Sequence, residues 1–412
     1  MYYKYRWTTI SLWMINHSIS WVAILCVGLL LPSMASDLNM THFQQGLIAS
    51  SPVWVGTILY LPSSIYAVAF SPRLITNLSL IAGIILIFVQ ASAPVFIILF
   101  IARLAFGIPN AFREAARAQI TRALFKNSEI IFVNGLTAFI LSLLYAIGYL
   151  LIPTLLELTN NSWRSTFVVF GGLSFFLTTA WMIWAQKHLP QPKNIPYSFQ
   201  RVNLIRNALA TRTVWIGALA FCGVHISWSA FNTFYPTFML DRHQISLQHS
   251  ALILGVEMPV AAIIALGAGF IAKTWKQRSF WFYISGILLP CRFLLLLWTD
   301  SIPLLLVLSM LGGMLWGFFP ITLTIPYSIP GILNKSIPVT HAFNFTLMSL
   351  GVALGPTIAG ALYEPLGDLR LTLIFTSLFS LSLCLAGFAI RNLNDSQNIQ
   401  DQENINTIEG IH

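Results

Sequence analysis

The chain has 412 residues, of which 57% are hydrophobic and 8% are charged, and its mean hydropathy is +0.76. About a quarter of the residues of a soluble globular protein are charged, so the composition excludes a soluble domain and indicates a polytopic membrane protein. The net charge of +9 would suggest a nucleic-acid partner in a soluble protein. Here the basic residues lie in short loops between apolar segments, so we expect no nucleic-acid binding.

A membrane-spanning helix needs about 20 largely apolar residues. The first half of the chain contains six such segments, at residues 8–31, 45–67, 74–92, 95–117, 130–152 and 165–186. The second half contains six more, at residues 213–236, 249–272, 279–298, 302–326, 338–362 and 371–390. The first segment shows no convincing cleavage site, so we expect it to remain as a helix. The predicted fold is all-α, with about 12 transmembrane helices in two pseudo-symmetric six-helix bundles.

A basic linker over residues 187–212 separates the two apolar halves and contains no Asp or Glu. Basic residues beside a membrane helix favour the cytoplasmic side. We therefore predict an N-terminal bundle over 1–186, a cytoplasmic central loop over 187–212 and a C-terminal bundle over 213–391. Residues 392–412 are rich in Asn, Gln, Asp and Glu, which predicts a disordered cytoplasmic tail.

The distribution of charge predicts the orientation of the chain in the membrane. Only Arg164, Arg242 and Arg370 fall on the proposed outer side, and Arg103 and Arg292 fall within the membrane. The remaining Lys and Arg residues lie on the proposed inner side. This bias predicts that both termini are cytoplasmic in a multi-pass protein of the bacterial inner membrane.

An internal repeat relates the two halves. The heptapeptide LPSMASD after the first segment reappears 204 residues later as YPTFMLD after the seventh. The matching pairs are Pro32 with Pro236, Asp37 with Asp241, Arg73 with Arg278, and Arg164 with Arg370. Parallel repeats related by an axis along the membrane normal are one of the arrangements found in secondary transporters.

Four further stretches carry a resemblance to a known family. They are LPSMASDLNMTHFQQGLIASSP before and within the second segment, LFIARLAFG in the fourth, NSWRSTF before the sixth and GVALGPTIAG in the eleventh. With the repeat, they make residues 1 to about 391 resemble the major facilitator superfamily of transporters. The resemblance implies two bundles that rock against each other around a central cavity.

The loop between the second and third segments departs from that family's pattern, Gly-x-Leu-Ala-Asp-Arg-x-Gly-x-Arg. The sequence SIYAVAFSPR keeps only Ala67 and Arg73, and the equivalent GFIAKTWKQR ends at Arg278 but has Lys273 at the Asp position. The resemblance implies that this loop holds one transport state through charged contacts, so Arg73 and Arg278 are gating-loop candidates. Neither loop keeps the acidic residue.

Ionisable groups within the membrane are costly and are functional candidates by default. Arg103 lies near the middle of the fourth segment, where a guanidinium can hold a carboxylate or lower the pKa of a nearby acid. The alternative is an arginine that braces helix carbonyls. Glu257 and Arg292 both lie about 10 Å deep, so they can pair, either as a protonation site or as a fixed ion pair, and the sequence leaves the pairing open.

The remaining candidates are polar and aromatic residues of the first, seventh and tenth segments. His17, with Asn16 beside it, and His225 can titrate near neutral pH, although a membrane histidine is often a neutral group bonded to a neighbouring helix. Trp228 and Trp316 can stack on an apolar or cyclic solute, or serve as packing residues. No substrate-binding role is distinguished from packing by sequence alone.

The sequence contains no phosphate loop, no HExxH or GxSxG motif and no nucleotide-binding domain. We therefore expect no enzyme activity, no cofactor and no metal. The four cysteines form no CxxC pair and are expected to be packing residues.

The sequence predicts a secondary transporter of a small organic solute, anionic or neutral, that works by alternating access with proton coupling. The expected partners are this solute, the lipid bilayer and protons, and we expect a monomer. A multidrug exporter is the alternative within the class. A non-transporting sensor and a membrane-embedded enzyme are the alternatives from other classes.

Overall fold

The structure is a computed structural model that describes residues 5–66, 70–189, 209–271, 275–319, 322, 337–389 and 391. These residues form helices and short connections, with no strand among them. Ten of the described helices are long and apolar enough to cross a membrane. The prediction of an all-α membrane fold is confirmed.

The helices of the first half run in chain order. They are α1 (Arg6–Leu25) continued by the 3-10 turn η2 (Cys26–Leu29), α2 (Leu31–Leu38), α3 (His42–Tyr66), α4 (Pro72–Ala91), α5 (Phe96–Leu124), α6 (Asn127–Leu158), α7 (Trp163–Ile183) and the turn η4 (Ala185–His188). Those of the second half are α9 (Arg212–His243), α10 (Leu247–Ile271), α11 (Trp275–Trp298), α12 (Ile302–Leu315), α14 (Ile337–Leu366), α15 (Leu369–Ser377) and η7 (Leu378–Leu381).

Every predicted segment overlaps one of these helices, but several boundaries were wrong. Helix α5 continues from the predicted end at residue 117 to Leu124, and α9 continues from 236 to His243. The extension of α5 is rich in Ala, Arg and Gln, which are good helix formers but fall outside an apolar window. Helix α12 ends at Leu315, although its segment was predicted to reach residue 326.

Local sequence signals define several helix ends. The Ser71 and Ser162 hydroxyls accept hydrogen bonds from backbone N–H groups of the first turns of α4 and α7, as N-caps do. Asn39 after α2 and Gln244 after α9 take left-handed backbone conformations, with φ of 50° and 54°. Such a residue commonly closes a helix C-terminus.

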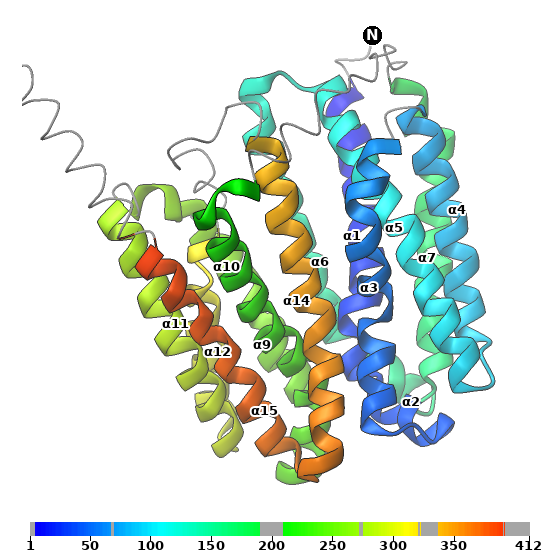
Figure 1. The fold of residues 1–412 in the computed structure, drawn as a ribbon. Helices are drawn as coiled ribbons and strands as arrows, with labels where there is room; N and C mark the ends of the chain where they lie inside the picture. The colour runs from blue at the N-terminus through cyan, green and yellow to red at the C-terminus, as the bar shows by residue number, and fades with distance from the viewer. Residues whose placement is uncertain are drawn as a thin grey trace, which may run out of the picture.

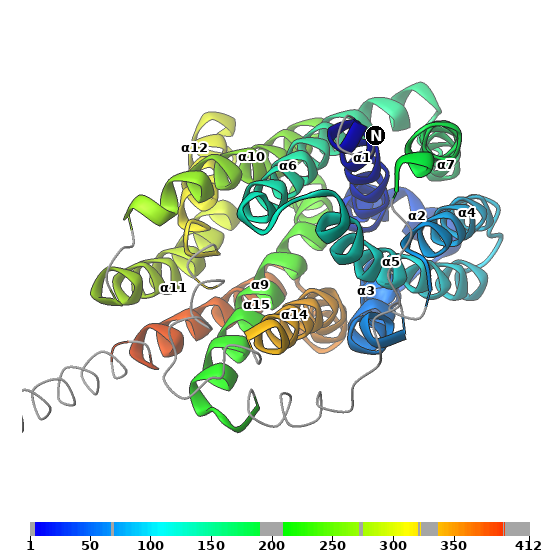
Figure 2. The ribbon, with the colours of Figure 1, turned by 90° about the horizontal axis from the view of Figure 1, so that it is seen from above.

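Figures 1 and 2 show α1 to α7 gathered on one side of the molecule and α9 to α15 on the other. Helices α1 and α9 are the most enclosed, with 72% and 78% of their apolar windows buried, against 33–50% for the other spanning helices. The predicted domain boundary lies mostly within residues 190–208, and the predicted tail begins at 392; both lie outside the described residues. The division into two domains therefore stays a prediction.

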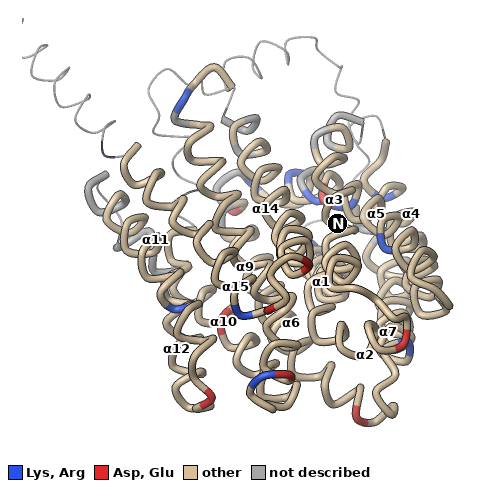
Figure 3. The backbone as a smooth tube through the Cα atoms, turned by 60° about the horizontal axis from the view of Figure 1, so that its bottom comes forward, with Lys and Arg blue, Asp and Glu red and all other residues tan. Residues whose placement is uncertain are grey.

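The outward faces of the peripheral helices expose large apolar side chains. Helix α4 presents Leu78, Ile81 and Ile85, and α7 presents Phe176, each at least 43% exposed. A soluble protein rarely exposes apolar surface on this scale, whereas lipid covers it in a membrane. Figure 3 shows how sparse the charged positions are along the same helices.

Several helix pairs join the two sides, mainly toward the end of the molecule opposite the N-terminus, which we call the far face (Figure 1). Helix α3 packs on α14, α6 on α10, and the α1 extension η2 on α9. Glycines allow the backbones to approach closely: a Cβ added to Gly46 would lie 2.2 Å from the Pro356 carbonyl oxygen. One added to Gly28 would lie 2.5 Å from the Asn232 carbonyl oxygen.

The repeated acidic and basic residues form different contacts in the two halves. Asp37 accepts hydrogen bonds from Arg164 and from the Trp163 indole, and the bond from Arg164 is the main cause that lowers the pKa of the Asp37 carboxyl. In the second half, the Arg370 guanidinium instead lies 5.7 Å from the Phe238 ring. The sequence repeat therefore reproduces the helices more closely than the ion pairs.

We predict that Gly46→Ala lowers the melting temperature of the purified protein, whereas Gly172→Ala does not. Both substitutions replace a helical glycine by alanine, and this replacement alone stabilises a helix by roughly 0.5–1 kcal/mol. At Gly46 the methyl group meets the Pro356 backbone, and overpacking typically costs about 1–3 kcal/mol, whereas nothing lies within 4 Å at Gly172. Equal melting temperatures for the two variants would contradict the close approach of α3 and α14.

Candidate functional site

A cluster of four charged or titratable side chains lies between α1 and α5, in the half of α5 nearer the N-terminal end of the molecule. We call it the His17–Glu114 cluster, and it consists of His17, Arg113, Glu114 and Arg117. His17 Nε2 lies 2.9 Å from Glu114 Oε1, and Arg117 Nε donates to Glu114 Oε2 at 2.7 Å. The Glu114 and Arg117 side chains are 26% and 31% exposed. The cluster is therefore within reach of water.

Arg113 supplies the second guanidinium of this cluster. Its Nη2 donates to Asn110 Oδ1, and the Asn110 amide in turn donates to the Phe106 carbonyl at 2.9 Å. The Arg113 side chain is buried, and its Nε has no hydrogen-bond partner among the described residues. A buried donor without a partner is costly, and a solute anion is one group that would satisfy it.

The sequence analysis identified His17 but missed the three residues of α5. The predicted segment 95–117 contains all three, but the charge count assigned its last arginines to the inner side and gave them no further role. A signal was present: Glu114 is the only acidic residue between Asp37 and Glu129, and Arg117 follows it at helical spacing. Spacing of three or four residues puts such side chains on one face of a helix.

In the second half, the structure brings together Glu257 and Arg292, a contact that the sequence left open. Arg292 Nη2 donates to Glu257 Oε2 at 2.5 Å, and the Trp316 indole donates to Oε1 at 2.9 Å. The Arg292 Nε also donates to the Leu308 carbonyl at 3.2 Å. Both charged side chains are almost fully buried, at 2% and 4% exposure. This arrangement has the geometry of the fixed ion pair.

The aromatic candidates surround this pair. The Trp316 ring centroid lies 5.2 Å from that of His225 and 6.2 Å from that of Trp228. The His225 Nδ1 lies 2.7 Å from the Phe221 carbonyl oxygen, so this nitrogen carries a proton. Five predicted residues, from α9, α10, α11 and the turn that follows α12, thus form one network: His225, Trp228, Glu257, Arg292 and Trp316.

The structure places Arg103 and Asn16 in packing positions. Arg103 is fully buried, and its Nε donates to the Ile48 carbonyl at 2.6 Å while Nη1 donates to the Gln90 side chain at 3.3 Å. The Asn16 amide donates to the Leu177 carbonyl of α7 at 3.2 Å. Of the two roles predicted for Arg103, these contacts match bracing of helix carbonyls. Asn16 faces α7, away from the His17–Glu114 cluster.

The gating-loop candidates are only partly described. Arg73 is exposed in the first turn of α4. Arg278 lies on α11, but its side chain is outside the described residues. Residues 67–69 and 272–274, which complete the two loops, also fall outside the described residues.

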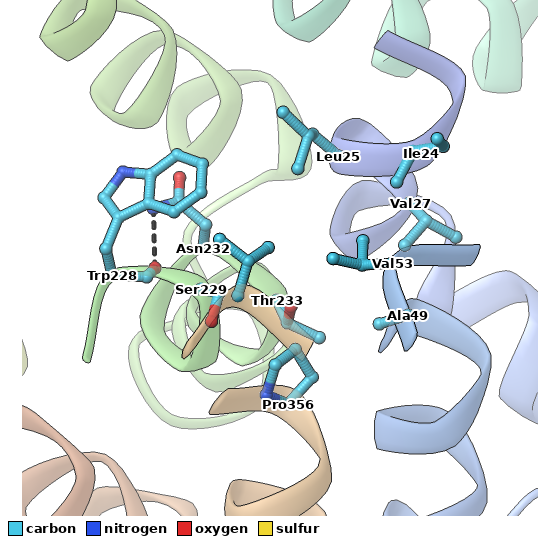
Figure 4. Close-up of a pocket in the computed structure, with 11 residues that line it drawn as sticks. Ile24, Leu25, Val27, Ala49, Val53, Trp228, Ser229, Asn232, Thr233 and Pro356 are labelled. Carbon is cyan, nitrogen blue, oxygen red and sulfur yellow. Dashed lines mark hydrogen bonds between the residues drawn. The ribbon is translucent and has the colours of Figure 1, made fainter. Parts of the chain in front are cut away.

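A small cavity lies where the two sides meet (Figure 4). Trp228, Asn232 and Thr233 of α9 face Ile24 and Val53 of the first half across it. Its volume of about 20 Å³ admits one water molecule, whereas small-molecule sites occupy about 300–1,000 Å³. In this conformation, this cavity among the described residues is therefore too small for a solute.

The phenols of α6 contact Asn232, which lines this cavity. The hydroxyls of Tyr145 and Tyr149 donate toward Asn232 Oδ1 at 3.3 and 3.4 Å, and the two hydroxyls lie 2.9 Å apart. Asn232 Nδ2 donates to the Trp228 carbonyl, the bond marked in Figure 4. These bonds link α6 of the first half to α9 of the second.

Packed membrane-spanning helices that bury charged and polar side chains define a polytopic membrane protein. The family description "Major Facilitator Superfamily" matches residues 13–331. The chain belongs to this superfamily, and the resemblance seen in the sequence is confirmed.

Solved structures support the same fold. The chain is similar to a bacterial homologue of the human lysosomal transporter Spinster in an inward-facing, unoccupied conformation, with a TM-score of 0.81 and 15% identity over 95% of this chain and 98% of that one. It is also similar to the nucleoside transporter NupG, with a TM-score of 0.73 and 15% identity over 93% and 98% of the two chains.

Among curated proteins, the chain is 24% identical over 159 residues to the hexuronate transporter of Escherichia coli strain K12. The match covers 34% of this chain and 36% of the relative. The chain therefore spans about a third of the length of the curated relative it matches. Membership of the superfamily establishes a membrane transporter of small solutes.

We predict that Glu257→Gln lowers the free energy of unfolding by about 3–5 kcal/mol, because it leaves the Arg292 charge buried without its partner. The double substitution Glu257→Gln with Arg292→Gln recovers most of this loss. Chemical denaturation in detergent measures both effects. The control is Asp300→Asn in the exposed turn before α12, for which we expect a change within about 0.5 kcal/mol. A single variant as stable as this control would contradict the buried pair.

Proposed function

We propose that the protein is a proton-coupled secondary transporter of a small organic anion, and that the His17–Glu114 cluster carries both the proton and the anion site. The observation that carries the proposal is the 2.9 Å contact between His17 Nε2 and Glu114 Oε1 beside two guanidiniums. A histidine titrates near physiological pH. A guanidinium binds a carboxylate with two parallel hydrogen bonds.

The charge of the cluster supports an anion over a neutral solute. With His17 neutral, Arg113, Glu114 and Arg117 sum to one positive charge. A proton on His17 raises the sum to two. The imidazolium donates to Glu114 Oε1 while Arg117 Nε keeps its bond to Oε2, and the added positive charge attracts a solute carboxylate. Binding of one monoanion restores a single positive charge. The cluster therefore favours uptake of one proton with one monovalent anion.

Sugar acids are the class of solute proposed. A hexuronate carries one carboxylate and several hydroxyls, and the hexuronate transporter is the curated relative that the chain matches. The carboxylate would bind Arg113 and Arg117, and the hydroxyls would find donors and acceptors such as Asn134, whose Oδ1 lies 3.3 Å from Arg117 Nη1. The relative's name supports this choice, and the cluster supplies its physical reason.

Alternating access supplies the transport cycle in this proposal. The bonds of Asn232 with Tyr145 and Tyr149 hold the far face closed, while the His17–Glu114 cluster is accessible from the other end. The proposed location is the bacterial cytoplasmic membrane with both termini inside, so this conformation faces the cytoplasm. Rocking of the two sides would break the α3–α14 contacts and expose the cluster to the outside.

The proposal predicts that purified protein in proteoliposomes accumulates labelled glucuronate or galacturonate when the interior is more alkaline. A membrane potential set by potassium and valinomycin at equal pH drives no uptake, because the charges of the proton and the monoanion cancel. Glucose, the uncharged counterpart, and nucleosides are not transported. Hexuronate uptake that does not depend on the pH gradient, or transport of nucleosides alone, would overturn the proposal.

The matched variants test the cluster itself. Glu114→Gln is expected to reduce pH-driven hexuronate uptake at least 10-fold, because the neutral amide cannot hold the imidazolium or anchor Arg117. Arg122→Gln lies two turns further along the same helix and is exposed, so it serves as the control for a charge change on α5. Equal uptake by both variants would contradict the assigned role of Glu114.

A further inference from the structure

Trp21 makes an unexpected contact with the His17–Glu114 cluster. It lies one turn beyond His17 on α1, toward the centre of the molecule, and its indole Nε1 lies 3.0 Å from His17 Nε2. His17 Nε2 also lies 2.9 Å from Glu114 Oε1. One imidazole nitrogen therefore contacts two groups of opposite hydrogen-bonding character.

The two contacts cannot both be hydrogen bonds at the same time. An indole N–H only donates, and an ionised carboxylate only accepts. Nε2 accepts from Trp21 only when it has a free lone pair, and it donates to Glu114 only when it carries a hydrogen. The protonation state of Nε2 therefore decides which of the two partners is bonded.

The other described groups around the His17 ring do not compete for Nε2, so the exchange of partners takes place at this atom. Trp13, one turn earlier on α1, stacks on the imidazole with centroids 4.8 Å apart, and this contact holds the ring plane. His17 Nδ1 is buried and has no hydrogen-bond partner among the described residues. The charged groups that interact with the ring are Glu114, Arg113 and Arg117, all from α5.

We propose that Trp21 couples the proton to the solute by exchanging its hydrogen-bond partner. In the neutral state the Trp21 N–H donates to His17 Nε2. When a proton from water binds Nε2, a new N–H bond forms, the imidazolium donates to Glu114, and the Trp21 N–H is released to an oxygen of the bound anion. The inference deepens the proposed function and rests on it.

The position of Trp21 supports this exchange. Its side chain is partly buried and packs at the edge of the main apolar core, between the cluster and the centre of the molecule. A tryptophan N–H removed from water requires an acceptor. Once the His17 lone pair is taken, a solute carboxylate or hydroxyl is the acceptor that the transport cycle brings to it.

The test replaces Trp21 by 3-benzothienylalanine, which has the shape of tryptophan with sulfur in place of the N–H group. The measurements are the pH profile and the KM of pH-driven hexuronate uptake. Loss of a donor that stabilises the neutral ring moves the profile to higher pH by about 0.5–1 unit. Loss of a donor to a charged solute raises KM about 10-fold or more. Trp21→Phe is the genetic counterpart.

Two controls separate this coupling role from a packing role. Trp181→Phe removes an indole donor that bonds Asn77 at 3.0 Å, away from the cluster, and is expected to leave the profile unchanged. In a His17→Gln background, the Trp21 substitution is expected to cause no shift of the profile. A wild-type pH profile and KM for the isosteric variant would overturn the role of Trp21 and leave the proposed function standing. Absence of pH-driven hexuronate uptake by the wild-type protein would overturn both.

Discussion

Removal of charge from water is the constraint on which the polar groups of this molecule depend. The hydrocarbon interior offers neither water nor counterions, so each buried charge must be satisfied by protein groups. Arg103 donates to helix carbonyls and an amide. Arg292 donates to Glu257 and a carbonyl, while its Nη1 has no hydrogen-bond partner among the described residues. These groups have fixed partners from neighbouring helices. Such partners hold the helices of each side together and leave little freedom for the charges to change state.

The His17–Glu114 cluster is held differently. Glu114 and Arg117 retain about a quarter to a third of their exposure, whereas Glu257 and Arg292 retain almost none. Partial hydration lowers the cost of changing partners, because water replaces a lost contact. A coupling site requires this property, since it must bind and release both a proton and a solute. The difference in hydration is the reason that we assign coupling to the first half and a structural role to the pair in the second.

Closure of the far face depends on small residues as much as on polar bonds. Gly46 and Gly28 let α3 and η2 meet backbone atoms of α14 and α9 directly. In a membrane, where apolar side chains gain little by leaving lipid, close backbone packing supplies much of the association energy. Contacts of this kind are extensive in the closed arrangement and are lost together when the backbones separate. These backbone contacts therefore favour two discrete conformations over a continuous series of intermediate ones.

The sequence predicted the helices well because hydrophobic length is a strong signal in a membrane protein. It also raised a contact of Glu257 with Arg292 as one possibility, from their equal depth. It did not reveal Glu114 and Arg117, because they lie at the inner end of the predicted segment 95–117, where basic residues are expected for orientation alone. The directions in which Arg103 and Asn16 point could not be predicted from the sequence. Their partners include backbone carbonyls of other helices, and every residue carries a backbone carbonyl, so no sequence pattern marks the partner.

The internal repeat shows why the two halves can diverge in chemistry while they keep one fold. Pro32 and Pro236 occupy equivalent places, yet Asp37 binds Arg164 while Arg370, the equivalent of Arg164, lies against aromatic rings. Helix packing depends on apolar volume and small residues, which both halves supply. Ion pairs depend on single side chains, so one substitution removes them without loss of the fold. A partly hydrated ionisable cluster in the first half and a buried ion pair in the second are therefore both compatible with the symmetry.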